Sequence, residues 1–242
     1  MTRLHRRAAL ALIGAALLDR GVPARAQTPV ASPAPLREDL ALRHYEILDD
    51  RAGGELRVLG EYQNTGKTTI VAPVLRLALT DAAGAPLETD ELFPADGRLP
   101  PGHTGGFSGI VRLARGAWTH ERLIACQTEL LGPADLDAAL AVRRVVEVVK
   151  TDALLHVTGE LANTGPTAIS GVRVRAIITR ATDDHFAGIG STAIAGPIPA
   201  HTTVGFSLSV LSADMPGIGP GDAYTYRLAP RRTTPLRVQC GA

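Results

Sequence analysis

The sequence contains one pattern twice, and the two copies are spaced 99 residues apart. Segment 60–70 reads GEYQNTGKTTI, and segment 159–169 reads GELANTGPTAI. The same offset aligns the GFS at 106–108 with the GFS at 205–207. A period of about 100 residues is too long for a solenoid unit and fits a complete β-sandwich domain. The repeat therefore predicts two copies of one domain.

Apolar residues alternate with polar residues inside each copy, as they do in half-buried β-strands. Leu75, Leu77 and Leu79 alternate with Arg76 and Ala78, so Arg76 and its repeat counterpart Arg175 are expected to point outward. Turn signals recur about every ten residues. The sequence therefore predicts an all-β protein of two tandem antiparallel immunoglobulin-like β-sandwich domains.

An Asn-Thr-Gly turn ends one strand in each copy. Asn and Gly tolerate positive φ angles, and an Asn side chain can bond nearby backbone groups. We expect Asn64 and Gly66 to form a structural turn in the first copy, and Asn163 and Gly165 to form its equivalent in the second.

Four segments follow from these patterns. Residues 1–26 are predicted to be a signal peptide, and the Pro-rich residues 27–36 a flexible leader. Residues 37–132 form the first sandwich repeat and residues 133–242 the second, with residues 121–131 and 235–240 as their closing strands.

The N-terminal segment has the three parts of an export signal. Arg3, Arg6 and Arg7 precede the uncharged run AALALIGAALL, and the small residues of Ala24-Arg25-Ala26 suit cleavage after Ala26. The run has 11 residues, whereas about 20 are needed to span a membrane. The Arg pair leaves both a Sec and a twin-arginine signal open. The mature chain is expected to be periplasmic or secreted, with no integral membrane span.

Removal of this segment makes the chain mildly acidic. Five Arg and one Asp are lost, which leaves 20 basic and 23 acidic residues and a net charge of −3. Such a chain has no electrostatic footprint for nucleic acid, so no nucleic-acid partner is expected.

Three motifs resemble the FxLYD-type immunoglobulin-like domains of bacterial exported proteins. They are Leu77-Ala78-Leu79-Thr80-Asp81 followed by Gly84, the Gly-x-x-x-Asn-Thr-Gly of residues 60–66, and the Leu-Pro-Pro-Gly…Phe of residues 99–107. Leu77 and Thr80 depart from the Phe and Tyr typical of that family. The resemblance implies a non-catalytic β-sandwich of the cell envelope, with no catalytic residues to carry over.

No motif points to an enzyme or to a cofactor. Phosphate loops, HExxH and dinucleotide fingerprints are absent, and Gly106-Phe107-Ser108-Gly109 is one residue short of a nucleophile elbow. We therefore expect no catalytic residues, no metal site and no cofactor. An alternative is a small-ligand or metal carrier that uses the inter-domain cleft, where the loop residues His103 and His201 could meet.

Two cysteines leave a choice open. An exported chain can form a disulfide, and a bond between Cys126 and Cys240 would lock the two repeats together. Alternatively, both residues face inward in separate cores as free thiols.

The second copy carries an additional stretch from Leu211 to Tyr226. This stretch is either a structural loop or a recognition loop that presents Tyr224 and Tyr226, because Tyr is favoured at interfaces. The favoured function is therefore a structural or protein-interaction module. Its partner would be an unknown envelope protein, bound at this loop or at an exposed sheet edge.

Overall fold

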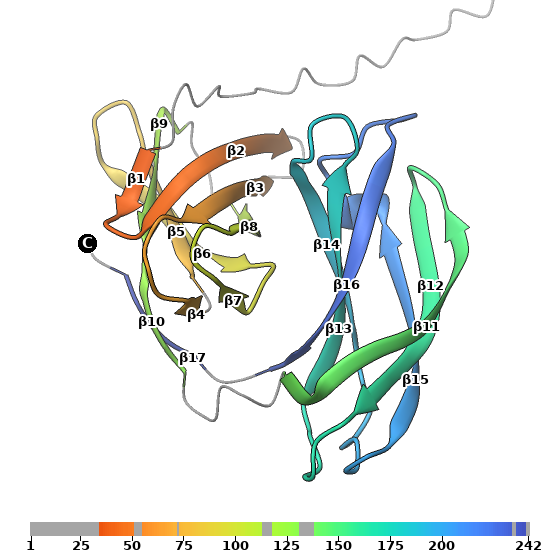
Figure 1. Cartoon of the computed structure of the whole chain (residues 1–242). Helices are drawn as coiled ribbons and strands as arrows, with labels where there is room; N and C mark the ends of the chain where they lie inside the picture. The colour runs from red at the N-terminus through yellow and green to blue at the C-terminus, as the bar shows by residue number, and fades with distance from the viewer. Residues whose placement is uncertain are drawn as a thin grey trace, which may run out of the picture.

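The computed structural model contains two β-sandwiches joined by one chain (Figure 1). It describes residues 34–50, 55–71, 73–112, 118–130, 138–233 and 236–240. The predicted signal peptide lies outside this range. Within the described residues the elements are antiparallel strands and short 3-10 segments, such as η2 (Ser212–Asp214). The all-β prediction with two tandem antiparallel sandwiches is confirmed.

The first sandwich, here called unit 1, packs two three-stranded layers. One layer has the order β2-β3-β8 and the other β6-β5-β9. The layers are joined where the end of β6 pairs with β8, at Phe93–Ser108 and Pro94–Phe107. The strands are β2 (Leu40–Asp50), β3 (Glu55–Asn64), β5 (Leu75–Thr80), β6 (Pro86–Pro94), β8 (Thr104–Arg112) and β9 (His120–Ala125).

The second sandwich, unit 2, repeats this topology. Its layers have the orders β11-β12-β15 and β14-β13-β16. The isolated bridge between Ile169 and Ile198 reproduces, at the same 99-residue offset, the pairing of Ile70 with Leu99 in unit 1. The strands are β11 (Leu140–Lys150), β12 (Leu154–Asn163), β13 (Val172–Arg180), β14 (Phe186–Ala193), β15 (Thr203–Leu211) and β16 (Tyr224–Arg232); the Ile70–Leu99 pair belongs to β4 (Ile70–Val71) and β7 (Arg98–Leu99).

Each sandwich encloses its own apolar core. Leu75, Leu77 and Leu79 are fully buried between the layers of unit 1. Val172, Val174 and their neighbours fill the same place in unit 2. The alternation read from the sequence is thus the alternation of core-facing and outward-facing side chains.

The chain adds a strand before the first repeat. β1 (Ala34–Arg37) pairs with the outer edge of β2, with Ala34 opposite Leu42. Residues 34–36, predicted to belong to a flexible leader, therefore form part of a sheet. Backbone pairing along an open strand edge explains this difference.

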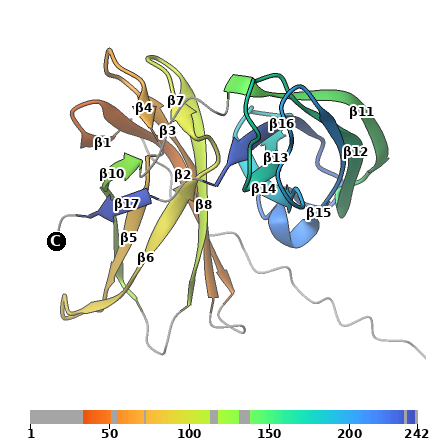
Figure 2. The same ribbon diagram turned by 90° about the horizontal axis from the view of Figure 1, so that it is seen from below.

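The C-terminal strand does not close unit 2. β16 completes that unit, and β17 (Leu236–Gln239) instead pairs with β10 (Gln127–Leu130) beside unit 1 (Figure 2). The prediction that residues 235–240 close the second sandwich is therefore wrong. Strand alternation is a local property and does not specify which sheet a strand joins.

Candidate functional site

The Asn-Thr-Gly turns are structural, as the sequence predicts. The Nδ2 of Asn64 donates to the carbonyls of Thr68 and Leu99 at 2.7 and 2.8 Å, and its Oδ1 accepts from the Gly66 amide at 2.9 Å. Asn163 makes the equivalent bonds in unit 2. Positive φ is not the reason for these glycines, because neither Gly66 nor Gly165 adopts it. A Cβ at Gly66 would instead lie 2.7 Å from the Cβ of Asp39.

Cys126 and Cys240 form a disulfide, which resolves the choice left open by the sequence. Cys126 precedes β10 and Cys240 follows β17, so the pairing of Gln127 with Gln239 brings the two residues together. The bond ties the end of the chain to unit 1 across a separation of 114 residues.

Tyr224 belongs to the core of unit 2 rather than to an exposed loop. Its side chain is 5% exposed, and its hydroxyl donates to the Thr151 carbonyl at 2.9 Å. Tyr226 packs partly against the same core. Burial is the main cause that raises the pKa of both tyrosines. The recognition-loop interpretation is therefore corrected for Tyr224, which is not available to a partner.

The two units share a buried apolar contact. Leu59 and Ala95 of unit 1 pack against Ile177 and Phe186 of unit 2, and each is at most 5% exposed. The Phe186 ring lies directly over Gly106 of β8, because a Cβ built there would fall within 2.8 Å of three ring atoms. The outer face of the β2-β3-β8 layer is thus covered by unit 2 around Gly106.

An ionisable cluster borders this contact. Glu61, which is 8% exposed, accepts a hydrogen bond from the Phe186 amide and lies 3.0 Å from Nδ1 of His185. The His185 ring stacks on His44 with their centroids 4.4 Å apart. The cluster extends to the buried Glu46, whose Oε1 is 3.1 Å from His44 Nε2. These contacts position unit 2 against unit 1.

Arg180 links the β13–β14 turn to the same cluster. Its guanidinium lies 3.5 Å from Glu46 and 2.8 Å from Asp183. The hydrogen bond from Arg180 holds the pKa of Asp183 below its usual value. Within the described part of the chain, no group of three or more His, Cys, Asp or Glu residues is arranged to hold a metal ion. His103 and His201 are each exposed, in the loops before β8 and β15.

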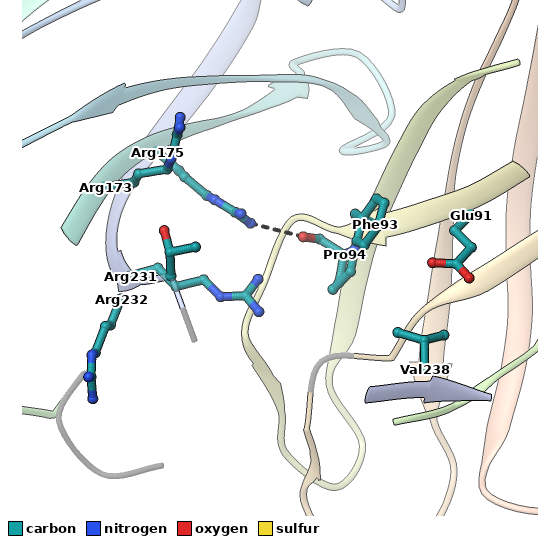
Figure 3. A pocket seen from close by; sticks show the side chains of 9 residues that line it. Glu91, Phe93, Pro94, Arg173, Arg175, Arg231, Arg232 and Val238 are labelled. Carbon is teal, nitrogen blue, oxygen red and sulfur yellow. Dashed lines mark hydrogen bonds between the residues drawn. The ribbon is translucent and has the colours of Figure 1, made fainter. Parts of the chain in front are cut away.

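A cleft rich in arginine opens between the units (Figure 3). Its volume is about 370 Å³, and β6 of unit 1 faces β13 and β16 of unit 2 across it. Arg173, Arg175, Arg231 and Arg232 line it, together with one acidic residue, Glu91. Arg175 points outward as the sequence predicts, but its guanidinium donates to the carbonyls of Pro94 and Ala95 in unit 1.

Strand β11 carries the second notable surface. Val145, Val146, Val148 and Val149 are 43, 58, 55 and 38% exposed. β11 is also the edge of its three-stranded layer among the residues that the structure describes. The candidate sites are therefore this edge and the arginine cleft.

Comparisons with known proteins identify no family. No protein-family model matches the sequence, and no curated protein matches it significantly. The chain is similar to solved β-glucuronidase 2 of Bacteroides uniformis, at 15% identity over 78% of this chain and 26% of that one, with a TM-score of 0.26. It is also similar to a glycosyl hydrolase family 2 member from Bacteroides cellulosilyticus. The identity is 15% over 78% of this chain and 28% of that one, and the TM-score is 0.23.

The chain spans about a quarter of the length of these enzymes. Similarity at this level supports neither an activity nor a substrate for this chain. Among the described residues, no helix has the length and apolar character needed to cross a bilayer.

Proposed function

We propose that this protein is an exported, non-catalytic interaction module that binds an extended segment of an envelope protein along β11. The observation that carries the proposal is the run of four exposed valines on an open sheet edge. Large exposed apolar side chains gathered on one strand are typical of an interaction surface. An open edge strand can accept a partner strand through its backbone groups.

The repeat supports this assignment, because it allows the same face to be compared in both units. In unit 1, the Glu61 side chain is 11% exposed and Gly106 lies under Phe186, since unit 2 covers that part of the face. In unit 2 the equivalent Glu160 side chain is 34% exposed, and a Cβ at the equivalent Gly205 would have no neighbour within 4 Å. The face that binds a neighbouring unit in the first repeat is thus uncovered in the second.

The chain itself provides a precedent for strand addition at this edge. β1 pairs antiparallel with the first residues of β2, which is the repeat equivalent of β11. The β11 segment keeps the same edge position. A partner strand there would extend the β11-β12-β15 layer in the way that β1 extends the layer of unit 1.

Charge defines the chemistry of the partner segment. The exposed residues along β11 include Arg143, Arg144 and Lys150, against one acidic residue, Glu147. Arg144 is already paired with Glu160 at 2.9 Å. A partner strand that combines acidic residues with β-branched residues would complement this edge in both charge and shape.

Two features support the further proposal that the chain is exported and resembles the FxLYD-type domains. A disulfide is typical of an oxidising compartment outside the cytoplasm. The Asp of the motif, Asp81, occupies the turn after β5, where its Oδ1 accepts hydrogen bonds from the amides of Ala83 and Ala85. These bonds give the motif a structural role, as expected of a domain family without catalytic residues.

The test is a crosslinking pull-down from native envelope extract with four baits: wild type, Val146→Lys, Val148→Lys and Ile110→Lys. Ile110 is the matched control, because it is 44% exposed on unit 1. We expect one dominant partner with wild type and Ile110→Lys, and about 10-fold less with either β11 variant. Equal capture by all four baits, with native circular dichroism spectra, would overturn the proposal.

A further inference from the structure

We propose that the arginine cleft between β6 and the β13–β16 pair binds a small organic anion, with a carboxylate or phosphate head and an apolar body. This site is separate from the β11 edge and goes beyond the interaction function proposed above. It would give the protein a second, small-molecule ligand.

The charge of the cleft favours an anion. Four guanidinium groups and one carboxylate line it. Arg173 of β13 lies directly opposite Arg231 of β16 in the strand register. The Arg173 guanidinium donates to Ser191 Oγ within unit 2 at 3.3 Å. A carboxylate or phosphate suits a wall of this composition, because a guanidinium matches the geometry of both groups.

Apart from Glu91, the opposite wall is apolar, which favours an organic ligand over an inorganic ion. Phe93 lines the cleft and is 51% exposed, beside Pro94 and Val238. A ligand body that covers the Phe93 ring would remove exposed aromatic surface from water. The cleft of about 370 Å³ is near the lower end of the volumes of small-molecule pockets, about 300–1,000 Å³.

The arginines are held in place from both units. Arg175 donates to the carbonyls of Pro94 and Ala95 at 3.0 and 3.1 Å. Arg231 packs against Gly97, where a Cβ would lie 3.1 Å from its Nε. Figure 3 shows Arg175 and Arg231 extending toward unit 1, whereas Arg232 points away from them. Side chains fixed in this way lose little freedom when a ligand binds.

The experiment is calorimetric titration of the purified protein with benzoate, phenyl phosphate, acetate and inorganic phosphate. We expect saturable binding of benzoate, phenyl phosphate or both, about 10-fold tighter than the matching ion without a ring. Benzoate alone would identify a carboxylate head, and phenyl phosphate alone a phosphate head. No saturable binding, or equal binding with and without the ring, would overturn the proposal.

The variant Arg231→Gln tests the site, because Arg231 extends into the cleft toward unit 1 (Figure 3). Arg122→Gln on the exposed face of β9 is the control with the same change in charge. We expect about 10-fold weaker binding for Arg231→Gln and unchanged binding for Arg122→Gln. Unchanged binding by Arg231→Gln with a native circular dichroism spectrum, or equal losses of binding in both variants, would contradict a binding role for Arg231.

Discussion

Replacement of Gly106 by Ala tests whether the two sandwiches are docked as the structure shows. A Cβ at this position would fall within 2.8 Å of three atoms of the Phe186 ring. The ring cannot easily move away, because it packs on Leu59 and Ile177 and its backbone amide is bound to Glu61. The added methyl group therefore overpacks a buried contact between the units.

The repeat supplies a control of the same chemistry. Gly205 is the counterpart of Gly106, and a Cβ there would have no neighbour within 4 Å. Overpacking of a well-packed core costs about 1–3 kcal/mol. For a protein of this size that corresponds to a fall in Tm of about 2–12 °C. At Gly205 we expect a change within about 0.5 kcal/mol.

Thermal unfolding of both variants measures the change in Tm. Hydrogen exchange then measures how well the contact between the two units is maintained. The Phe186 amide donates to Glu61 across the boundary between the units, so its exchange reports on docking. We expect faster exchange of this amide in Gly106→Ala than in Gly205→Ala. Equal unfolding temperatures together with equal exchange would refute the docked arrangement.

Three other predictions concern the covalent link, the turns and the tyrosines. Replacing Cys240 by Ser removes the disulfide and should lower the free energy of unfolding by about 4–5 kcal/mol in a chain-entropy estimate. Denaturant unfolding of wild type with and without reductant measures the same loss, and equal midpoints would contradict the prediction. Asn64→Ala should cost about 1–3 kcal/mol because buried carbonyls lose their donor, and Asn163→Ala should cost a similar amount in the same assay. Burial raises the pKa of all four tyrosines, that of Tyr45 to about 12. Because the folded-state pKa values exceed the unfolded ones, stability should be full below about pH 10 and fall as the pH rises toward 12; absorbance of phenolate during alkaline titration checks this, and half-ionisation at pH 10 in the folded protein would contradict it.

The repeat made most of the fold predictable. Leu75, Leu77 and Leu79 are buried because their spacing of two places them on one face of a strand, and the offset of 99 residues transfers the same logic to unit 2. The strand with which β17 pairs was not predictable in this way. Its pairing with β10, and hence the disulfide, depends on contacts across more than 100 residues.

The sites were harder to predict than the fold. Alternating Arg173 and Arg175 indicated an outward face, but only the register of β13 with β16 places Arg231 opposite Arg173. No sequence pattern marked the valines of β11 as a site, because their exposure follows from the place of β11 at a sheet edge. Tyr224 was a candidate for an exposed recognition loop because it follows a Gly- and Pro-rich stretch. In the structure its side chain is buried in the core of unit 2.

The most direct test of the proposed interaction uses the scarcity of lysine in this chain. The sequence contains two lysines: Lys150 at the end of β11, and Lys67 in the exposed turn after Asn64. An amine-reactive crosslinker in native envelope extract, read by mass spectrometry, can therefore compare the β11 edge with a site on unit 1. The proposal predicts partner peptides joined to Lys150 and none joined to Lys67. Partner peptides at Lys67 alone, or at neither lysine, would contradict binding along β11.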